Sequence, residues 1–219
     1  KLVLTTTVAL LALGMIVILI TEYGNADTLG PMPLPQKLLV AFFHSVTPRT
    51  AGFALISVGG MAAYTLFFMI LLMFVGGASG STAGGVKVST FGMLVTTVWS
   101  TIRGSEHAGA FGREFKIPQI HRALTVVMLS LALVATVVLA LTIVEKDLGF
   151  LEVLFETFSA FGTVGLSTGI TPGLSTAGKA IMVVTMFAGR LGPLTLALSL
   201  VERQQRTVYR YPQDDVRIG

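Results

Sequence analysis

Two long runs of the sequence contain no charged residue, and they limit the folds open to this chain. Residues 2–21 form an uncharged run of 20 residues, and residues 123–144 form another of 22. A helix needs about 20 apolar residues to cross a bilayer, and a signal peptide has a shorter apolar core. Charged residues make up only 12% of the chain, against about 25% in soluble domains. The sequence therefore predicts an all-α integral membrane protein, and its start at Lys1 suggests a fragment of a longer chain.

Each long run begins a unit of four parts, and a constant spacing relates the two units. After a polar stretch comes a short apolar segment, at 37–46 or 150–160, which has the length of a re-entrant helix. A loop that contains glycine follows, and then a longer apolar helix, expected at 58–75 and 177–200. Identical residues recur 113 positions apart, among them Thr50 and Thr163, Gly52 and Gly165, and Gly76 and Gly189. We interpret this pattern as two tandem pore-loop repeats, each with a helix, a re-entrant pore helix, a filter loop and a second helix.

The repeat and the charges together predict the domains and their orientation. The expected parts are a first unit at 1–102 with a broken inner helix, a connector at 103–122, a second unit at 123–203 and a tail at 204–219. The connector and the tail carry most of the arginines, whereas the stretches after the long runs are acidic. By the positive-inside rule the connector and the tail are cytoplasmic, so we expect a multi-pass plasma-membrane protein. Both units then have the same orientation, which argues against an inverted-repeat transporter.

The two glycine-bearing loops follow the pattern T-x-G-hydrophobe. Non-helical backbone lies at membrane depth only where protein or water satisfies it, and rings of loop carbonyls replace the hydration shell of K⁺ in channel filters. One such motif alone is more often an ordinary turn, but two copies behind short helices favour a cation filter. The expected first filter loop (50–53) and second filter loop (163–166) consist of Thr50, Ala51, Gly52 and Phe53, and of Thr163, Val164, Gly165 and Leu166.

A glycine-rich loop at 76–85, with the sequence GGASGSTAGG, is expected to interrupt the second helix of the first unit. From 58 to 101 that helix would have 44 residues, or about 66 Å, roughly twice the apolar core of a bilayer. We expect the loop to line the path below the filter as a gate, although a kink or close packing through small residues remains open. Arg190, which the repeat aligns with position 77, is expected near mid-membrane, facing the pore and close to the loop carbonyls. The expected gate residues are Gly76, Gly77, Ser79, Gly80, Ser81, Thr82, Gly84, Gly85, Lys87 and Arg190.

Other functional classes find little support in the sequence. The stretch GSTAGGVK resembles a phosphate-binding loop, but Val86 separates Gly85 from Lys87 and a membrane helix precedes it. The three histidines are isolated and no nucleophile–base set occurs, so we expect neither an enzyme nor an organic cofactor. The absence of cysteine excludes thiolate metal sites, and nucleic acid is not expected as a partner. Arg49, placed at the outer mouth, is either an interfacial anchor or a residue packed behind the filter.

The motifs resemble those of the Trk/Ktr/HKT superfamily of potassium transporters, most closely the Ktr-type membrane subunit. SVTPRTAGF resembles the third filter segment of that family, and FSAFGTVGLSTGITPGLS resembles the fourth. GGASGSTAGGVKVSTF is similar to the family's glycine-rich break, and FAGRLGPLTL to its arginine-bearing inner helix. The family has four units per subunit, so this chain corresponds to the C-terminal half, and the N-terminal two repeats are missing.

The resemblance implies what the chain transports and what it assembles with. It implies translocation of K⁺ through a central pore, with Na⁺ as an alternative ion. It also implies a homodimer in the membrane on a cytoplasmic ring of nucleotide-binding, RCK-type regulatory subunits, which would bind the nucleotide in place of this chain. The alternatives are a non-conducting membrane scaffold and a channel or transporter for another monovalent cation.

Overall fold

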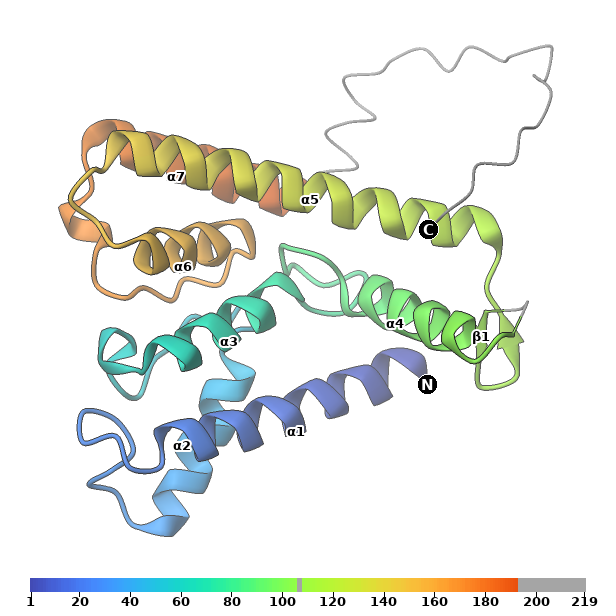
Figure 1. The fold of residues 1–219 in the computed structure, drawn as a ribbon, viewed down its shortest axis with the longest axis horizontal. Helices are drawn as coiled ribbons and strands as arrows, with labels where there is room; N and C mark the ends of the chain where they lie inside the picture. The colour runs from blue at the N-terminus through green and yellow to red at the C-terminus, as the bar shows by residue number, and fades with distance from the viewer. Residues whose placement is uncertain (106–107, 193–219) are drawn as a thin grey trace.

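The structure is a computed structural model that describes residues 1–105 and 108–192 (Figure 1). This part of the chain is mostly α-helical, as the sequence predicts. Its elements are α1 (Leu2–Glu22), α2 (Leu34–Val46), η1 (Val58–Gly60), α3 (Ala63–Phe74), α4 (Val88–Ile102), β1 (Gly109–Ala110), β2 (Arg113–Glu114), α5 (Ile117–Val144), α6 (Phe150–Phe161), η2 (Thr171–Gly173) and α7 (Thr176–Leu191), where η marks a single 3₁₀ turn. The order helix, short helix, 3₁₀ turn, helix occurs twice, once before the hairpin and once after it.

Among the described residues, α1 and α5 are the helices long and apolar enough to cross a membrane. Only 11% of the most apolar window of α1 is buried, and large side chains such as Leu4, Ile16 and Ile20 are exposed. A core helix of a soluble protein would bury such residues, so the exposed apolar face fits lipid as its solvent. The apolar composition of α1 and the exposure of its large side chains therefore both favour a membrane helix.

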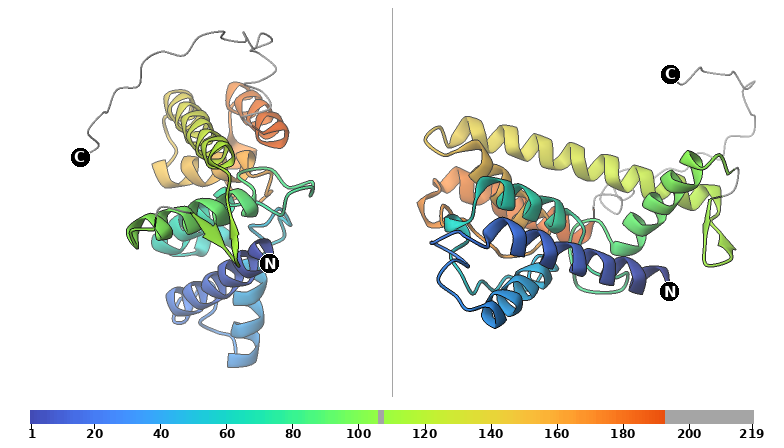
Figure 2. Two further views of the ribbon diagram at one scale, coloured as in Figure 1. Left: turned by 90° about the vertical axis from the view of Figure 1, so that its right-hand side faces the viewer. Right: turned by 60° about the horizontal axis from the view of Figure 1, so that its bottom comes forward.

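Helix α6 lies at the centre of the fold and joins the two halves of the chain. It contacts α3 on one side and α5 and α7 on the other, while α1 packs against α2, α3 and α4. Figures 1 and 2 show the resulting layers, with α1 and α2 at one end, α3 and α6 between, and α5 and α7 at the other end. Phe74 of α3 meets Phe158 and Phe161 of α6, with ring centroids 5.9 and 6.2 Å apart. These aromatic contacts join α3 to α6, and the loops that follow α2 and α6 lie beside each other.

In both halves of the chain a glutamate at the end of the long helix holds the start of a later helix. The carboxylate of Glu22 accepts a hydrogen bond from the backbone N–H of Ala62, at 3.0 Å, just before α3. The carboxylate of Glu145 accepts one from the backbone N–H of Ser175, at 2.9 Å, just before α7. Orphan N–H groups at a helix start need such acceptors. Ala62 and Ser175 are 113 positions apart, so the two donors correspond in the repeat, whereas Glu22 and Glu145 are 123 positions apart and correspond only in lying at the ends of α1 and α5.

Several helix limits differ from those expected from the sequence. The helix expected at 58–75 starts only at Ala63, because the segment with Gly59 and Gly60 forms the 3₁₀ turn η1, and a side chain at Gly59 would lie 2.6 Å from the carbonyl oxygen of Thr168. Helix α5 starts at Ile117 instead of 123, with a proline in its first turn, inside the segment expected as a connector. Its 28 residues extend about 42 Å, so polar residues beyond the apolar core of the bilayer complete it.

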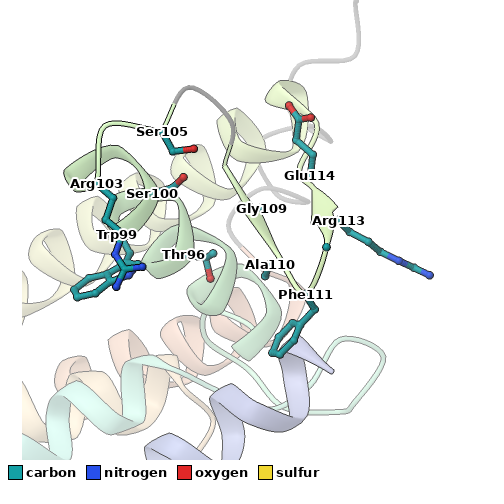
Figure 3. Close-up of a pocket in the computed structure, with 11 residues that line it drawn as sticks. Thr96, Trp99, Ser100, Arg103, Ser105, Gly109, Ala110, Phe111, Arg113 and Glu114 are labelled. Atoms are coloured by element: carbon teal, nitrogen blue, oxygen red, sulfur yellow. The ribbon is translucent and has the colours of Figure 1, made fainter.

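The connector also contains a small β-hairpin, β1–β2, that the sequence analysis did not anticipate. Its turn residues Phe111 and Gly112 have φ angles of 55° and 73°, and positive φ at both central positions is typical of a type I′ hairpin turn. The hairpin and α4 line a pocket of about 550 Å³ (Figure 3). The guanidinium of Arg103 lies 4.7 Å from the centroid of the Trp99 ring there. None of the described filter or gate residues lines this pocket.

Candidate ion path

The two filter loops lie against each other in the structure. A side chain on Gly52 would overlap the carbonyl oxygen of Val164 and would lie 3.4 Å from the Cα atom of Gly165. A side chain on Gly165 would in turn lie 3.7 Å from the Cα atom of Gly52. The fold therefore brings together the two glycines that the repeat singled out, and it does so through backbone alone.

Both filter loops have the same unusual backbone conformation. Thr50 and Gly52 have φ angles of 71° and 73°, and Thr163 and Gly165 have φ angles of 53° and 90°. A positive φ in a β-branched residue is strained, and such strain persists only where the surroundings enforce it. In an extended chain successive carbonyls point to opposite sides, and a change in the sign of φ at alternate residues can turn them to the same side. This conformation therefore suits a row of carbonyls that faces one path.

The hydrogen-bonding state of the loop carbonyls separates the expected filter residues into two groups. The Thr47 hydroxyl donates to the carbonyl oxygen of Phe53, and the Ser159 hydroxyl donates to that of Leu166, both at 2.6 Å. The carbonyls of Phe53 and Leu166 are thus already bonded, which the sequence did not indicate. Within the described part of the chain, no hydrogen bond reaches the carbonyls of the other six filter residues, which are Thr50, Ala51, Gly52, Thr163, Val164 and Gly165.

Two buried polar residues stand behind the filter loops, at positions that the sequence does not indicate. His44 of α2 accepts a hydrogen bond at Nε2 from the backbone N–H of Leu55, at 3.2 Å. Glu156 of α6 accepts one from the backbone N–H of Thr168, also at 3.2 Å. An isolated histidine is expected to be structural, which fits the contact of His44, whereas the acidic pattern of the sequence gives no sign that Glu156 lies behind a loop. The available signal was a polar residue inside a short apolar helix at membrane depth, which usually has a function.

The glycine-rich loop interrupts the helix where the sequence predicts a break, between α3 and α4. Three backbone hydrogen bonds close its base: Gly76 N–H to the Val86 carbonyl at 2.8 Å, Val86 N–H to the Phe74 carbonyl at 3.1 Å, and Val88 N–H to the Gly77 carbonyl at 3.1 Å. Its tip, at 78–82, is exposed. The loop is therefore anchored at its base and open at its tip.

One side of the glycine-rich loop touches the second filter loop. The backbone N–H of Gly84 donates to the Thr163 hydroxyl oxygen at 3.0 Å. A side chain at Gly84 would lie 2.8 Å from Thr163 Oγ1 and 3.0 Å from the carbonyl oxygen of Gly162. A side chain at Gly85 would lie 3.6 Å from the Cα atom of Gly162. Glycine is thus required for the loop to reach this contact with the filter.

The cations near the glycine-rich loop differ from the sequence-based expectation. The Lys87 ammonium donates to the carbonyl of Ala83 and, at 3.5 Å, to that of Ser81. Arg190 lies exposed in the last turn of α7, near enough to Lys87 to repel it, and makes no hydrogen bond with the loop within the described residues. Lys87 therefore makes the contact expected of Arg190, which lies in the last turn of α7.

Arg49 also lies elsewhere than expected. Its guanidinium Nη1 donates to the carbonyl oxygen of Val75 at 3.2 Å, where α3 ends and the glycine-rich loop begins. The other end of α3 is the one held by Glu22, in the acidic part of the chain expected outside. Arg49 and Glu22 therefore contact opposite ends of α3, whereas the sequence-based prediction puts both on the outer side. The backbone reverses direction after α2, and the sequence gives no sign of how deep that reversal lies.

The candidate ion ligands at this site are backbone carbonyl oxygens. No group of three or more His, Cys, Asp or Glu side chains that could hold a metal ion occurs in residues 1–105 and 108–192. Carbonyl oxygens without donors, on two facing loops, are suited to a weakly bound monovalent cation that exchanges its water for them.

Comparison with known proteins identifies relatives over the whole chain. The Ktr system potassium uptake protein B of Bacillus subtilis is 47% identical over 219 residues, which are all of this chain and 49% of that protein. The potassium/sodium uptake protein NtpJ of Enterococcus hirae is 42% identical over 224 residues, with the same shares. The chain thus spans about half the length of these curated relatives. Both are named as ion uptake proteins and not as enzymes.

A solved structure shares the fold. The crystal structure of the potassium transporter TrkH from Vibrio parahaemolyticus matches with a TM-score of 0.73 and 19% identity, over 90% of this chain and 43% of that one. The family model of TrkH, described as a cation transport protein, matches residues 2–210. Together with the identity to the Bacillus protein, this match shows that the chain belongs to the TrkH family of cation transport proteins.

Proposed function

We propose that this chain forms half of a subunit that moves K⁺ across the membrane through a central path. The observation that carries the proposal is the set of six filter carbonyls that receive no hydrogen bond in the described residues, while the adjacent carbonyls of Phe53 and Leu166 do. Carbonyls that lack a donor need another partner, and a dehydrated alkali cation is one. The names of the Bacillus and Enterococcus relatives support potassium, and that of the Enterococcus protein makes sodium the second candidate.

The proposed subunit consists of four pore-loop units, of which this chain supplies two. The repeated order of elements and the similar contacts of Glu22 and Glu145 support the reading of residues 1–102 and 123–203 as two such units. Since the chain spans about half of its relatives, we place the other two units in the remaining half of the protein. Assembly as a multi-pass membrane homodimer on a ring of nucleotide-binding regulatory subunits belongs to the same proposal.

The glycine-rich loop serves as the gate in this proposal. Its N–H contact with Thr163 and its exposed tip support this role. Lys87 holds the tip through the carbonyls of Ser81 and Ala83. Arg190 would act through repulsion of Lys87. A change in the position of α4, which begins immediately after Lys87, would then move the loop.

The substitution Gly165→Ser in the complete transporter tests the filter assignment. Gly165 has a φ of 90° and faces Gly52, so any side chain there strains the loop backbone. We expect weaker discrimination of K⁺ against Na⁺, measured as K⁺ uptake into uptake-deficient cells with Na⁺ as competitor. Gly173→Ser, where a side chain meets open space, is the matched control. An unchanged apparent affinity for K⁺ in Gly165→Ser rules out the filter assignment and favours the scaffold alternative.

A further inference from the structure

Glu156 is a buried carboxylate in the middle of the apolar helix α6, and the function proposed above does not use it. Burial of a charge costs several kcal/mol unless hydrogen bonds compensate for it. Glu156 Oε1 accepts from the Ser167 hydroxyl and from the Thr168 N–H, the latter at 3.2 Å. Its Oε2 accepts from the Thr171 hydroxyl at 3.0 Å. All three donors belong to the segment that directly follows the second filter loop.

Hydrogen bonds from three successive places along α6 hold the second filter loop. Glu156 provides the place farthest from the C-terminal end of α6. The backbone N–H groups of Thr163 and Val164 donate to the last carbonyls of α6, at 3.0 and 2.8 Å. The Ser159 hydroxyl then donates to the Leu166 carbonyl. Glu156 lies about one turn earlier in α6 and fixes residues 167–171. The loop therefore runs back along α6 and is tied to it at both ends.

Packing alone does not hold this loop in place. A pocket of about 290 Å³ lies beside it, lined by Glu156, Thr163, Gly165 and, from α7, Met182 and Met186. A loop with strained φ angles next to such a space would relax unless its hydrogen bonds prevented this. The hydrogen bonds from α6 therefore hold the loop together with the packing of Val164 and Leu166 in the core.

The first filter loop is held differently. Its equivalent segment donates from Leu55, which lies 113 positions before Thr168, to Nε2 of His44. A neutral imidazole has a single acceptor nitrogen, whereas a carboxylate can accept several hydrogen bonds. The two loops thus have matching backbone conformations but different supporting side chains. The His44 imidazole supports the first loop, and the Glu156 carboxylate supports the second.

We propose that Glu156 is a positioning residue, which holds the carbonyls of the second filter loop at the spacing that favours K⁺ over Na⁺. This inference rests on the proposed function of the loop as a filter. Glu156 does not contact the ion; it acts through Ser167, Thr168 and Thr171. Charge-assisted hydrogen bonds are stronger than neutral ones, which suits a loop whose backbone is strained.

The test compares Glu156→Ala with Glu156→Gln in the complete transporter. Alanine removes every hydrogen bond, and we expect the ratio of apparent affinities for K⁺ and Na⁺ to fall at least about tenfold. Glutamine retains a carbonyl oxygen for Ser167 and Thr168, and its NH₂ can donate to the Thr171 oxygen, so we expect a loss of at most about threefold. Equal losses in the two variants, or an unchanged ratio in Glu156→Ala, overturn the proposal.

Two further variants keep the test decisive. Glu145→Ala removes a carboxylate that supports α7 and not the filter, so it should lower the amount of protein and leave the ion ratio unchanged. If Glu156→Ala does not reach the membrane, the pair Ser167→Ala and Thr171→Val removes two donors while α6 stays intact, and an unchanged ratio there refutes the proposal. Gly165→Ser distinguishes a failure of the filter assignment from a failure of the proposed role of Glu156. If it leaves discrimination unchanged, the filter assignment fails; if it alone lowers discrimination, only the role of Glu156 fails.

Discussion

Gly84→Ala perturbs the contact between the glycine-rich loop and the second filter loop with a single methyl group. That methyl would lie 2.8 Å from both Oγ1 and Cγ2 of Thr163 and 3.0 Å from the carbonyl oxygen of Gly162, all shorter than an ordinary contact. The loop must retreat, and the hydrogen bond from Gly84 N–H to Thr163 lengthens or breaks. Overpacking and the lost hydrogen bond together cost the closed loop position about 2 kcal/mol. This shifts the equilibrium between closed and open loop about 30-fold.

The assay is K⁺ uptake by the complete transporter in uptake-deficient cells, with and without the regulatory subunit. If the loop restrains flow in the closed position, Gly84→Ala should raise uptake in the absence of the regulator and reduce the regulator's effect. Gly173→Ala is the matched control, because the same methyl group meets nothing within 4 Å there and Gly173 lies outside the glycine-rich loop. Uptake equal to the parent's in both conditions refutes the reasoning, since the loop would then have moved without consequence.

Three further outcomes can be measured in the same system. Gly52→Ala should impair K⁺ discrimination more than Gly165→Ala, because a methyl on Gly52 overlaps the Val164 carbonyl, whereas one on Gly165 meets nothing closer than 3.7 Å; the reverse order contradicts the facing arrangement of the loops. Arg190→Ala should lower ion flux, because loss of the repulsion on Lys87 strengthens the hold of Lys87 on the loop carbonyls, and parental flux would exclude that role. Arg113→Cys in this cysteine-free chain should be labelled by an impermeant reagent only from the cytoplasmic side, and labelling from outside reverses the topology.

The sequence predicted those features that depend on length and on spacing. Uncharged runs gave the two long helices, and the constant spacing of 113 residues identified Gly52 and Gly165, which the fold brings into contact. The break at 76–85 could be predicted because a helix of that length would exceed the bilayer and because glycine disfavours helix. These predictions succeed because the physics behind them is local or is repeated along the chain.

The misses concern side chains whose partners are distant in the sequence. Burial of Glu156 depends on a loop that returns along α6, which charge patterning does not reveal. Arg49 bonds to the carbonyl of Val75, which lies 26 positions later, where α3 ends. The start of α5 was misjudged because charge marks the edge of the apolar core, and a helix can continue beyond it into water.

The glycine-rich loop contacts only one of the two filter loops through a side-chain hydroxyl, and this asymmetry yields a matched pair of variants. Thr50 and Thr163 occupy the same position in the two loops and share a positive φ, so valine strains both backbones alike and removes a hydroxyl from each. Only the Thr163 hydroxyl accepts the Gly84 N–H; no hydrogen bond to the Thr50 side chain occurs in the described residues. Thr163→Val should therefore reduce the effect of the regulatory subunit on K⁺ uptake, whereas Thr50→Val should preserve it. If both variants lose regulation equally, the response arises from backbone strain in the filter, and the contact between the loops does not carry the signal.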